Sequence, residues 1–207
     1  MPYRASTQPA LAPTLLPFAG NRIAQEVVLV LAGTALIAIA AKIKVPFYPV
    51  PMTLQTLAIM LIAASYGFRL GTVTVIAYLG EGLLGLPVFT NTPPAAAGPL
   101  YFLGPTGGFL LGFVVLAMVV GYLADRGWDR SVVRLFIAIS AGQVVLFALG
   151  FAWLAWFAQL SSGAMGLGVE KALVAGVTPF IWAGLLKGAL AAFLVPAAWS
   201  LLRTGDG

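Results

Sequence analysis

Two ionisable residues, Glu81 and Lys187, lie inside long apolar stretches of the sequence. An ionised side chain at mid-depth in a bilayer costs about 3 kcal/mol, so each of the two is a candidate functional residue. The Lys187 ammonium could hold the carboxylate of an anionic ligand. Its alternative roles are to reach the membrane interface or to form an ion pair with Glu81. Glu81 stands among three glycines in the run YLGEGLLGLP, where ligand contact and a structural role as a partner for Lys187 or a backbone N–H both remain open.

A polar cluster follows the proline-rich run VPFYPVP. Gln55, with Thr53 and Thr56 beside it, could hydrogen-bond an amide or ureido group of a ligand. Capping of a helix that begins after Pro51 is the alternative, and it explains Thr53 better than Gln55. Gln55 is therefore the second candidate for ligand binding.

Two further candidates are Asn91 and Tyr101. Asn91 lies in a second proline-rich segment, where a turn is the alternative explanation. Tyr101 belongs to a group of aromatic residues at the expected membrane boundary, which predicts an aromatic belt from which one or two rings could stack on a ligand. The group comprises Phe47, Tyr48, Tyr101, Phe102 and Trp182.

The residue types that are absent exclude several kinds of chemistry. The sequence has no cysteine and no histidine, which excludes disulfides, thiolate or imidazole metal sites and Ser-His or Cys-His nucleophiles. We expect no metal and no cofactor. The run FLGPTGGFLLGF lacks the Lys-Ser or Lys-Thr pair of a phosphate-binding loop, so ATP binding there is not expected. An intramembrane enzyme would have only Glu81 and Lys187 to work with, and no serine flanks Lys187.

The composition predicts a membrane protein. Of the 207 residues, 61% are hydrophobic and 8% are charged, against roughly 45–50% and roughly 25% in soluble domains. The net charge is +5, but the basic residues are scattered singly, which does not indicate a nucleic-acid site. Because a membrane-spanning helix needs about 20 apolar residues, the chain has room for little besides spanning helices and their loops.

The apolar runs predict an all-α integral membrane protein with six transmembrane helices. Residues 21–203 are expected to form one membrane domain, preceded by a flexible tail over residues 1–20. The predicted helices cover residues 23–41, 52–67, 71–86, 107–124, 132–157 and 181–202. Glycines four residues apart, Gly108 with Gly112 and Gly184 with Gly188, predict close helix packing.

Basic residues predict the orientation. Placing both termini in the cytoplasm puts seven arginines inside, against Lys42, Lys44 and Lys171 outside. The inside set is Arg4, Arg22, Arg69, Arg126, Arg130, Arg134 and Arg203. Three loops then share the outer face of the cell membrane and could cover a small-molecule site: Lys42 to Pro51, Pro87 to Pro105, and Gln159 to Thr178, the last with a short helix in its middle.

Four runs of the sequence resemble the BioY family, the biotin-specific substrate-binding (S) components of energy-coupling-factor (ECF) transporters. They are VPFYPVPMTLQTLAIML, GFRLGTVTVIAYLGEGLLGLPVF, YFLGPTGGFLLGF and PFIWAGLLKGALAA, spread between about residue 23 and residue 202. The resemblance implies the six-helix ECF S-component fold, with biotin bound near the outer face under the first and third outer loops. It also implies a separate transmembrane coupling protein (T component) and ABC ATPase subunits as partners.

The resemblance also carries over particular residues. Gln55 matches the Gln of the family's Thr-Leu-Gln run, and Lys187 matches its helix-six lysine. The family's common pattern has an Asp where this chain has Gly184, and some relatives have an Arg where it has Leu110. Glu81 is then a candidate to replace the missing acceptor for the ureido N–H groups of biotin.

Two other functions fit the sequence less well. An S component for thiamine or riboflavin would favour a different polar lining. A purely structural membrane protein would have little reason to bury ionisable groups.

Overall fold

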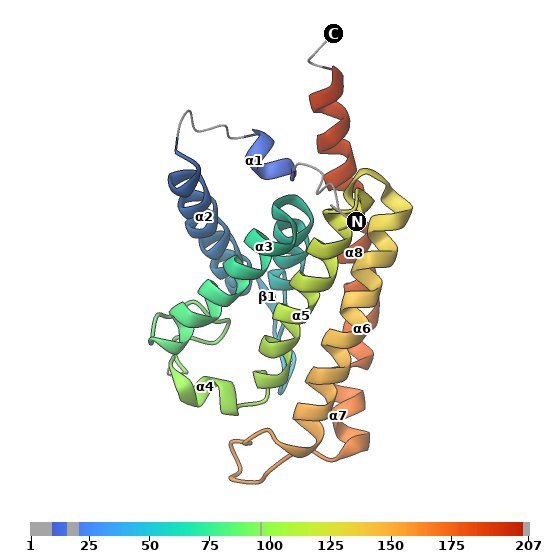
Figure 1. Ribbon diagram of the computed structural model, residues 1–207. Coiled ribbons are helices and arrows are strands. Elements are labelled where there is room, and N and C mark those ends of the chain that lie inside the picture. The colour runs from blue at the N-terminus through green and yellow to red at the C-terminus, as the bar shows by residue number, and fades with distance from the viewer. Residues whose placement is uncertain (1–9, 16–20, 96, 205–207) are drawn as a thin grey trace, which may run out of the picture.

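The computed structural model of the protein describes residues 10–15, 21–95 and 97–204. Long helices packed into a bundle make up most of it (Figure 1). These helices are α2 (Arg22–Lys42), α3 (Gln55–Leu83), α5 (Gly107–Ala124), α6 (Val132–Trp156) and α8 (Thr178–Thr204). The shorter elements are α1 (Leu11–Leu15), α4 (Pro99–Leu103), the 3-10 helix η1 (Trp128–Arg130), α7 (Val169–Gly176) and the antiparallel strands β1 (Lys44–Val45) and β2 (Met52–Thr53).

The predicted helices are present, but their count differs. Five helical stretches of the described chain are long and apolar enough to cross a membrane, and the fifth, Val169–Leu202, runs through α7 and α8. The predicted count of six transmembrane helices is not confirmed, because the helices expected over 52–67 and 71–86 form the single element α3. The β1–β2 hairpin is a small exception to the all-α prediction.

Helix α3 reverses its direction at Gly67. This glycine has φ 77° and ψ −176°, a conformation that breaks a helix and that side chains other than glycine rarely adopt. A Cβ atom added at Gly71 would lie 3.1 Å from Cα of Ala63, eight residues earlier, whereas eight residues of straight helix span about 12 Å. The two limbs of α3 therefore pack against each other as a helical hairpin, which can be followed in Figure 1.

Helix α5 packs at the centre of the bundle, between α3 and α6. Two of its glycines allow α6 to approach closely. A Cβ atom at Gly108 would lie 2.2 Å from Cβ of Trp153, and one at Gly112 would lie 3.0 Å from Cα of Leu146. The close packing predicted for these two glycines is confirmed.

The three loops expected at the outer face lie together at one end of the bundle, where α4 and α7 are found (Figure 1). Tyr48 of the first loop lies with its Oη 3.3 Å from Oγ of Ser161 in the third. The Gln159 N–H donates to the carbonyl of Leu103 in α4. The short helix expected in the third loop is α7. We call this end of the bundle the loop end.

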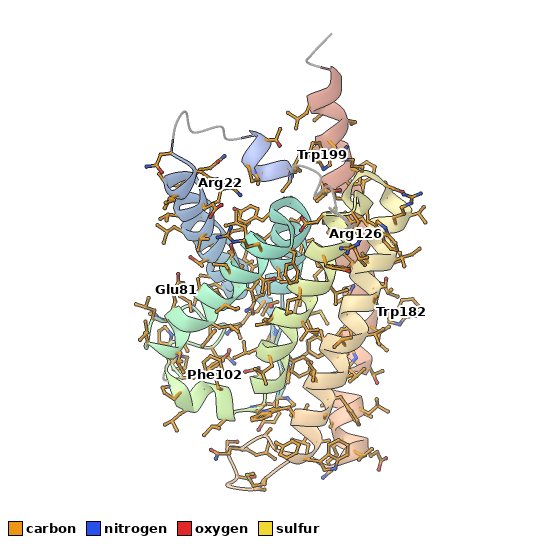
Figure 2. The ribbon with its side chains drawn as sticks, in the orientation of Figure 1. Arg22, Glu81, Phe102, Arg126, Trp182 and Trp199 are labelled. Atoms are coloured by element: carbon orange, nitrogen blue, oxygen red, sulfur yellow. The ribbon has the colours of Figure 1, made fainter. Side chains whose placement is uncertain are left out.

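The tail predicted over residues 1–20 falls mostly outside the described residues, which omit 1–9 and 16–20. Its described part contains α1, and Leu11 of this helix is buried. At the same end of the bundle lie Arg22, Arg126 and Trp199, whereas Phe102 lies toward the loop end (Figure 2).

Candidate functional site

A cavity of about 60 Å³ lies at the loop end of the bundle, and it contains three of the predicted site residues. Most of its wall is aromatic or aliphatic. The lining residues are Val50, Pro51, Thr53, Gln55, Thr56, Phe89, Thr90, Tyr101, Thr106, Phe109, Leu110, Phe113, Leu146, Phe147, Phe180 and Lys187. Ligand pockets usually enclose about 300–1,000 Å³. A vitamin-sized molecule therefore requires the loops over this cavity to shift.

Lys187 is the cation of the cavity. Its Nζ donates to the carbonyl oxygen of Thr53 at 2.9 Å and to Oγ1 of Thr56 at 2.8 Å. An ammonium group has three N–H donors, and no third acceptor is found among the described residues. Both of these acceptors are uncharged. The salt bridge in the described part of the chain is Arg22–Glu26, so Lys187 is not paired with a carboxylate there. Lys187 is thus positioned to take an anion.

Gln55 is buried, with 4% of its surface exposed, at the first turn of α3. Its Nε2 donates to Oη of Tyr78 at 3.0 Å, and this hydroxyl donates to the carbonyl of Val88 at 3.1 Å. Its backbone N–H donates to Oγ1 of Thr53. The N-cap of α3 is Leu54 rather than Thr53, so the capping role predicted for this threonine is not confirmed. Gln55 therefore lines the cavity and also links α3 to the loop that covers it.

Phe89 closes the cavity from the loop side. Its ring is 1% exposed and stacks on Tyr101 with centroids 4.6 Å apart. Tyr78 and Phe102 meet its ring edge to face, each at a centroid distance of 5.5 Å. The ring also fits against Gly82, where an added Cβ atom would lie 2.0 Å from Cζ. Gly82, next to Glu81, thus admits an aromatic side chain.

Tyr101 and Asn91 lie next to each other. Burial raises the pKa of the Tyr101 phenol above its ordinary value, against smaller lowering effects of the Thr106 side chain and the Asn91 backbone. The Asn91 side chain itself accepts from Nζ of Lys44 at 2.8 Å. Tyr101 lines the cavity, and Asn91 lies beside it without lining it.

Glu81 does not line the cavity. It is partly exposed, lies on the flank of α3 (Figure 2) and makes no ion pair with Lys187 among the described residues. Trp182 of the predicted aromatic belt is 79% exposed and projects from α8 (Figure 2). The structure therefore brings together Gln55, Tyr101 and Lys187, with Asn91 adjacent and Glu81 apart.

Sequence reasoning missed two polar residues of the cavity, Thr90 and Thr106. The Thr90 side chain is 8% exposed, and its hydroxyl has no hydrogen-bond partner within the described part of the chain. A buried hydroxyl without a partner is unusual and leaves Thr90 able to meet a ligand. The sequence feature that could have indicated Thr90 is its position next to Asn91 in a proline-rich loop. Nothing in the sequence shows that this loop packs near Lys187.

Comparisons with known proteins agree on one family. The sequence profile of the BioY family matches residues 9–204. Biotin transporter BioY of Thermotoga maritima is 36% identical over 161 residues, 78% of this chain and 88% of that protein. A probable biotin transporter BioY of Pyrococcus horikoshii is 34% identical over 171 residues, 83% of this chain and 94% of that protein.

A solved structure has the same fold. The crystal structure of the S-component for biotin from an ECF-type ABC transporter superposes with a TM-score of 0.72 at 25% sequence identity, covering 88% of this chain and 95% of that one. The family profile, the relatives and the shared fold lead to the same conclusion: the chain belongs to the BioY family.

Proposed function

We propose that the protein binds biotin in the cavity at the loop end and takes part in its uptake as the substrate-binding subunit of an ECF-type ABC transporter. The observation that carries this proposal is Lys187, a cation in a mostly apolar cavity with one N–H donor to spare. Biotin has one carboxylate, one ureido ring and one thioether ring, which suit a site with one cation, a few hydrogen-bonding groups and apolar walls. The relatives described as biotin transporters support the same ligand.

In the proposed complex, Lys187 holds the biotin carboxylate. Gln55 supplies a hydrogen bond to the ureido ring, and Tyr101 packs against the ligand. Asn91 lies beside the cavity wall and reaches the ureido ring only if its loop moves on binding. Glu81 accepts from the ureido N–H groups only if the segment after α3 moves on binding, because it lies outside the cavity wall. Such a movement accords with the small volume of the cavity.

Residues 21–203 form one membrane domain in this proposal, with six crossings of the membrane. The hairpin at Gly67 supports this count, since the two limbs of α3 can each make a short crossing. The bias of the arginines supports two cytoplasmic termini in the cytoplasmic membrane. Lipids surround the helices, no nucleic acid is bound, and a T component and ABC ATPase subunits supply the energy.

Ligand binding to the purified chain in detergent tests the proposal. Biotin, its neutral amide, thiamine and riboflavin are titrated while tryptophan fluorescence is followed. Biotin is expected to saturate the protein and to bind more tightly than its amide, which has no carboxylate for Lys187. Saturation by thiamine or riboflavin but not by biotin would overturn the proposal.

Two lysine variants locate the site. A hydrogen bond to a charged group is worth about 1.5–3 kcal/mol, so Lys187→Met is expected to weaken biotin binding roughly 10- to 100-fold and to remove the preference over the amide. Lys171→Met changes an exposed lysine of α7, which lines no part of the cavity, and is expected to bind like the unchanged protein. Equal biotin affinity in the two variants would show that Lys187 does not bind biotin.

A further inference from the structure

Lys42 makes three side-chain hydrogen bonds, more than any other lysine in the described chain. All three go to backbone carbonyls of one loop, which also contributes to the cavity wall. We infer that Lys42 is a positioning residue that latches residues 87–92 over the cavity and thereby sets how fast the ligand enters and leaves. The identity of this ligand rests on the proposed function. Residues 87–92 are called the covering segment below.

The Lys42 ammonium lies within a ring of backbone carbonyls from the covering segment. Its Nζ donates to the carbonyl oxygens of Pro87 at 2.7 Å, Phe89 at 2.6 Å and Thr92 at 2.5 Å. These three acceptors use all three N–H donors of the group. No carboxylate pairs with Lys42 in the described part of the chain, so its hydrogen-bond acceptors there are these backbone carbonyls.

The bonded carbonyls belong to the part of the loop that closes the cavity. Phe89 and Thr90 line the cavity, and in the sequence they lie between Pro87 and Thr92, the first and last residues bonded by Lys42. The segment is held from its other side by Tyr78, whose hydroxyl donates to the carbonyl of Val88. Its own turn is tightened by the Thr92 hydroxyl, which donates to the carbonyl of Phe89 at 2.8 Å. Moving Phe89 and Thr90 out of the way therefore requires the contacts of Lys42 to break.

Helix α2 has no other part in the site. Lys42 is its last residue, and no residue of α2 lines the cavity. Lys44, two residues on, supports the segment less directly, through the Asn91 side chain at 2.8 Å and the Thr90 carbonyl at 3.3 Å. The role of Lys42 is thus separable from ligand contact, unlike the role of Lys187.

A latch predicts a particular kinetic signature. The cavity has a volume of about 60 Å³, too small for a vitamin-sized molecule, so the covering segment must move both for entry and for exit. Weakening the latch raises the population of the open form, which speeds association and dissociation together. A merely structural defect in the cavity would lower affinity without speeding association.

The first test measures biotin association and dissociation rates on the full chain in detergent. Lys42→Met keeps most of the aliphatic stem and removes the charge, and it is expected to raise both rates about tenfold or more while affinity changes less than about threefold. Lys44→Met is expected to have a smaller effect in the same direction, and Lys171→Met none. Rates in Lys42→Met within twofold of the unchanged protein, or slower association with lost affinity, would overturn the inference.

The second test does not depend on the ligand. Because the sequence has no cysteine, Thr90→Cys introduces a single thiol in the covering segment, at a position that is 8% exposed. Its reaction with a maleimide is expected to be about tenfold faster when Lys42→Met is added and unchanged when Lys171→Met is added. Equal labelling in all three backgrounds would overturn the latch. Faster labelling in a protein that binds no biotin would keep the latch and reject the proposed ligand.

Discussion

Gln143 of α6 lies directly over Gly184 of α8, so closely that a Cβ atom added at Gly184 would stand 2.3 Å from Oε1 of Gln143. One turn further, a Cβ atom at Gly188 would stand 3.0 Å from Nε2 of the same amide. Gln143 is buried, and its Nε2 has no hydrogen-bond partner among the described residues. The amide therefore fills the space that an Asp side chain at position 184 would need. A side chain at position 184 therefore fits only if the Gln143 amide moves.

The pair Gln143 and Gly184 gives a double-mutant test. Gly184→Asp alone is expected to destabilise the protein by about 1–3 kcal/mol, because its side chain collides with the Gln143 amide. Adding Gln143→Ala removes the collision and is expected to recover most of the stability and of biotin binding, so the two effects are not additive. Thermal unfolding and biotin titration in detergent measure both. Simple addition of the two single effects would show that the side chains do not compete.

Most of the fold could be predicted from the sequence, because hydrophobic length and loop residues determine where membrane helices lie. The helix over 107–124 has the predicted bounds. The sequence predicts a helix on each side of Gly67, where the two limbs of α3 lie. The limbs form one continuous element because the turn is made by one glycine in a positive-φ conformation rather than by a loop with its own composition. The sequence also gave no sign of the β1–β2 hairpin, whose strands have two residues each.

The site was less predictable than the fold. Gln55 and Lys187 stood out because polar groups are costly in apolar segments, and the structure places both in the cavity wall. Glu81 stood out for the same reason but lies on the flank of α3, since the face of a helix on which a residue lies depends on packing partners that the sequence does not specify. In the sequence, Lys42 serves only as one of the basic residues that predict the orientation in the membrane. Its hydrogen bonds to carbonyls 45 to 50 residues away cannot be predicted from the local sequence.

Gly82 and Gly80 form a matched pair near the end of α3. Alanine favours a helix over glycine by about 1 kcal/mol, and a Cβ atom at Gly80 would meet nothing within 4 Å. Gly80→Ala is therefore expected to leave stability unchanged or slightly raised. A Cβ atom at Gly82 would lie 2.0 Å from the Phe89 ring, so Gly82→Ala is expected to displace Phe89 and weaken biotin binding roughly tenfold or more. Equal affinity in the two variants would show that Phe89 does not need its place against Gly82.

Asp129 predicts a pH dependence of stability at the end of the bundle opposite to the cavity. It is 3% exposed in η1, its Oδ2 accepts from Nε1 of Trp199, and its Oδ1 has no partner among the described residues. Burial raises the pKa of Asp129 above the ordinary 3.8, against smaller lowering effects of the Trp199 hydrogen bond and the Arg130 charge. The native state thus binds this proton more tightly than the unfolded state, and its contribution to stability is lost as the pH rises through the native pKa.

Thermal unfolding of the protein and of Asp129→Asn, followed in detergent between pH 7.5 and about pH 4, measures this contribution. The unfolding temperature of the unchanged protein is expected to rise relative to that of Asp129→Asn as the pH falls toward 3.8. A tenfold difference in proton affinity is worth about 1.4 kcal/mol, and 1 kcal/mol moves the unfolding temperature by roughly 2–4 °C in a chain of this size. Asp125, whose pKa burial also raises, is present in both proteins, so its own burial effect cancels in the difference and only its charge interaction with Asp129 does not. A difference that stays constant over this range, or that falls on acidification, would show that Asp129 titrates alike in the folded and unfolded chains.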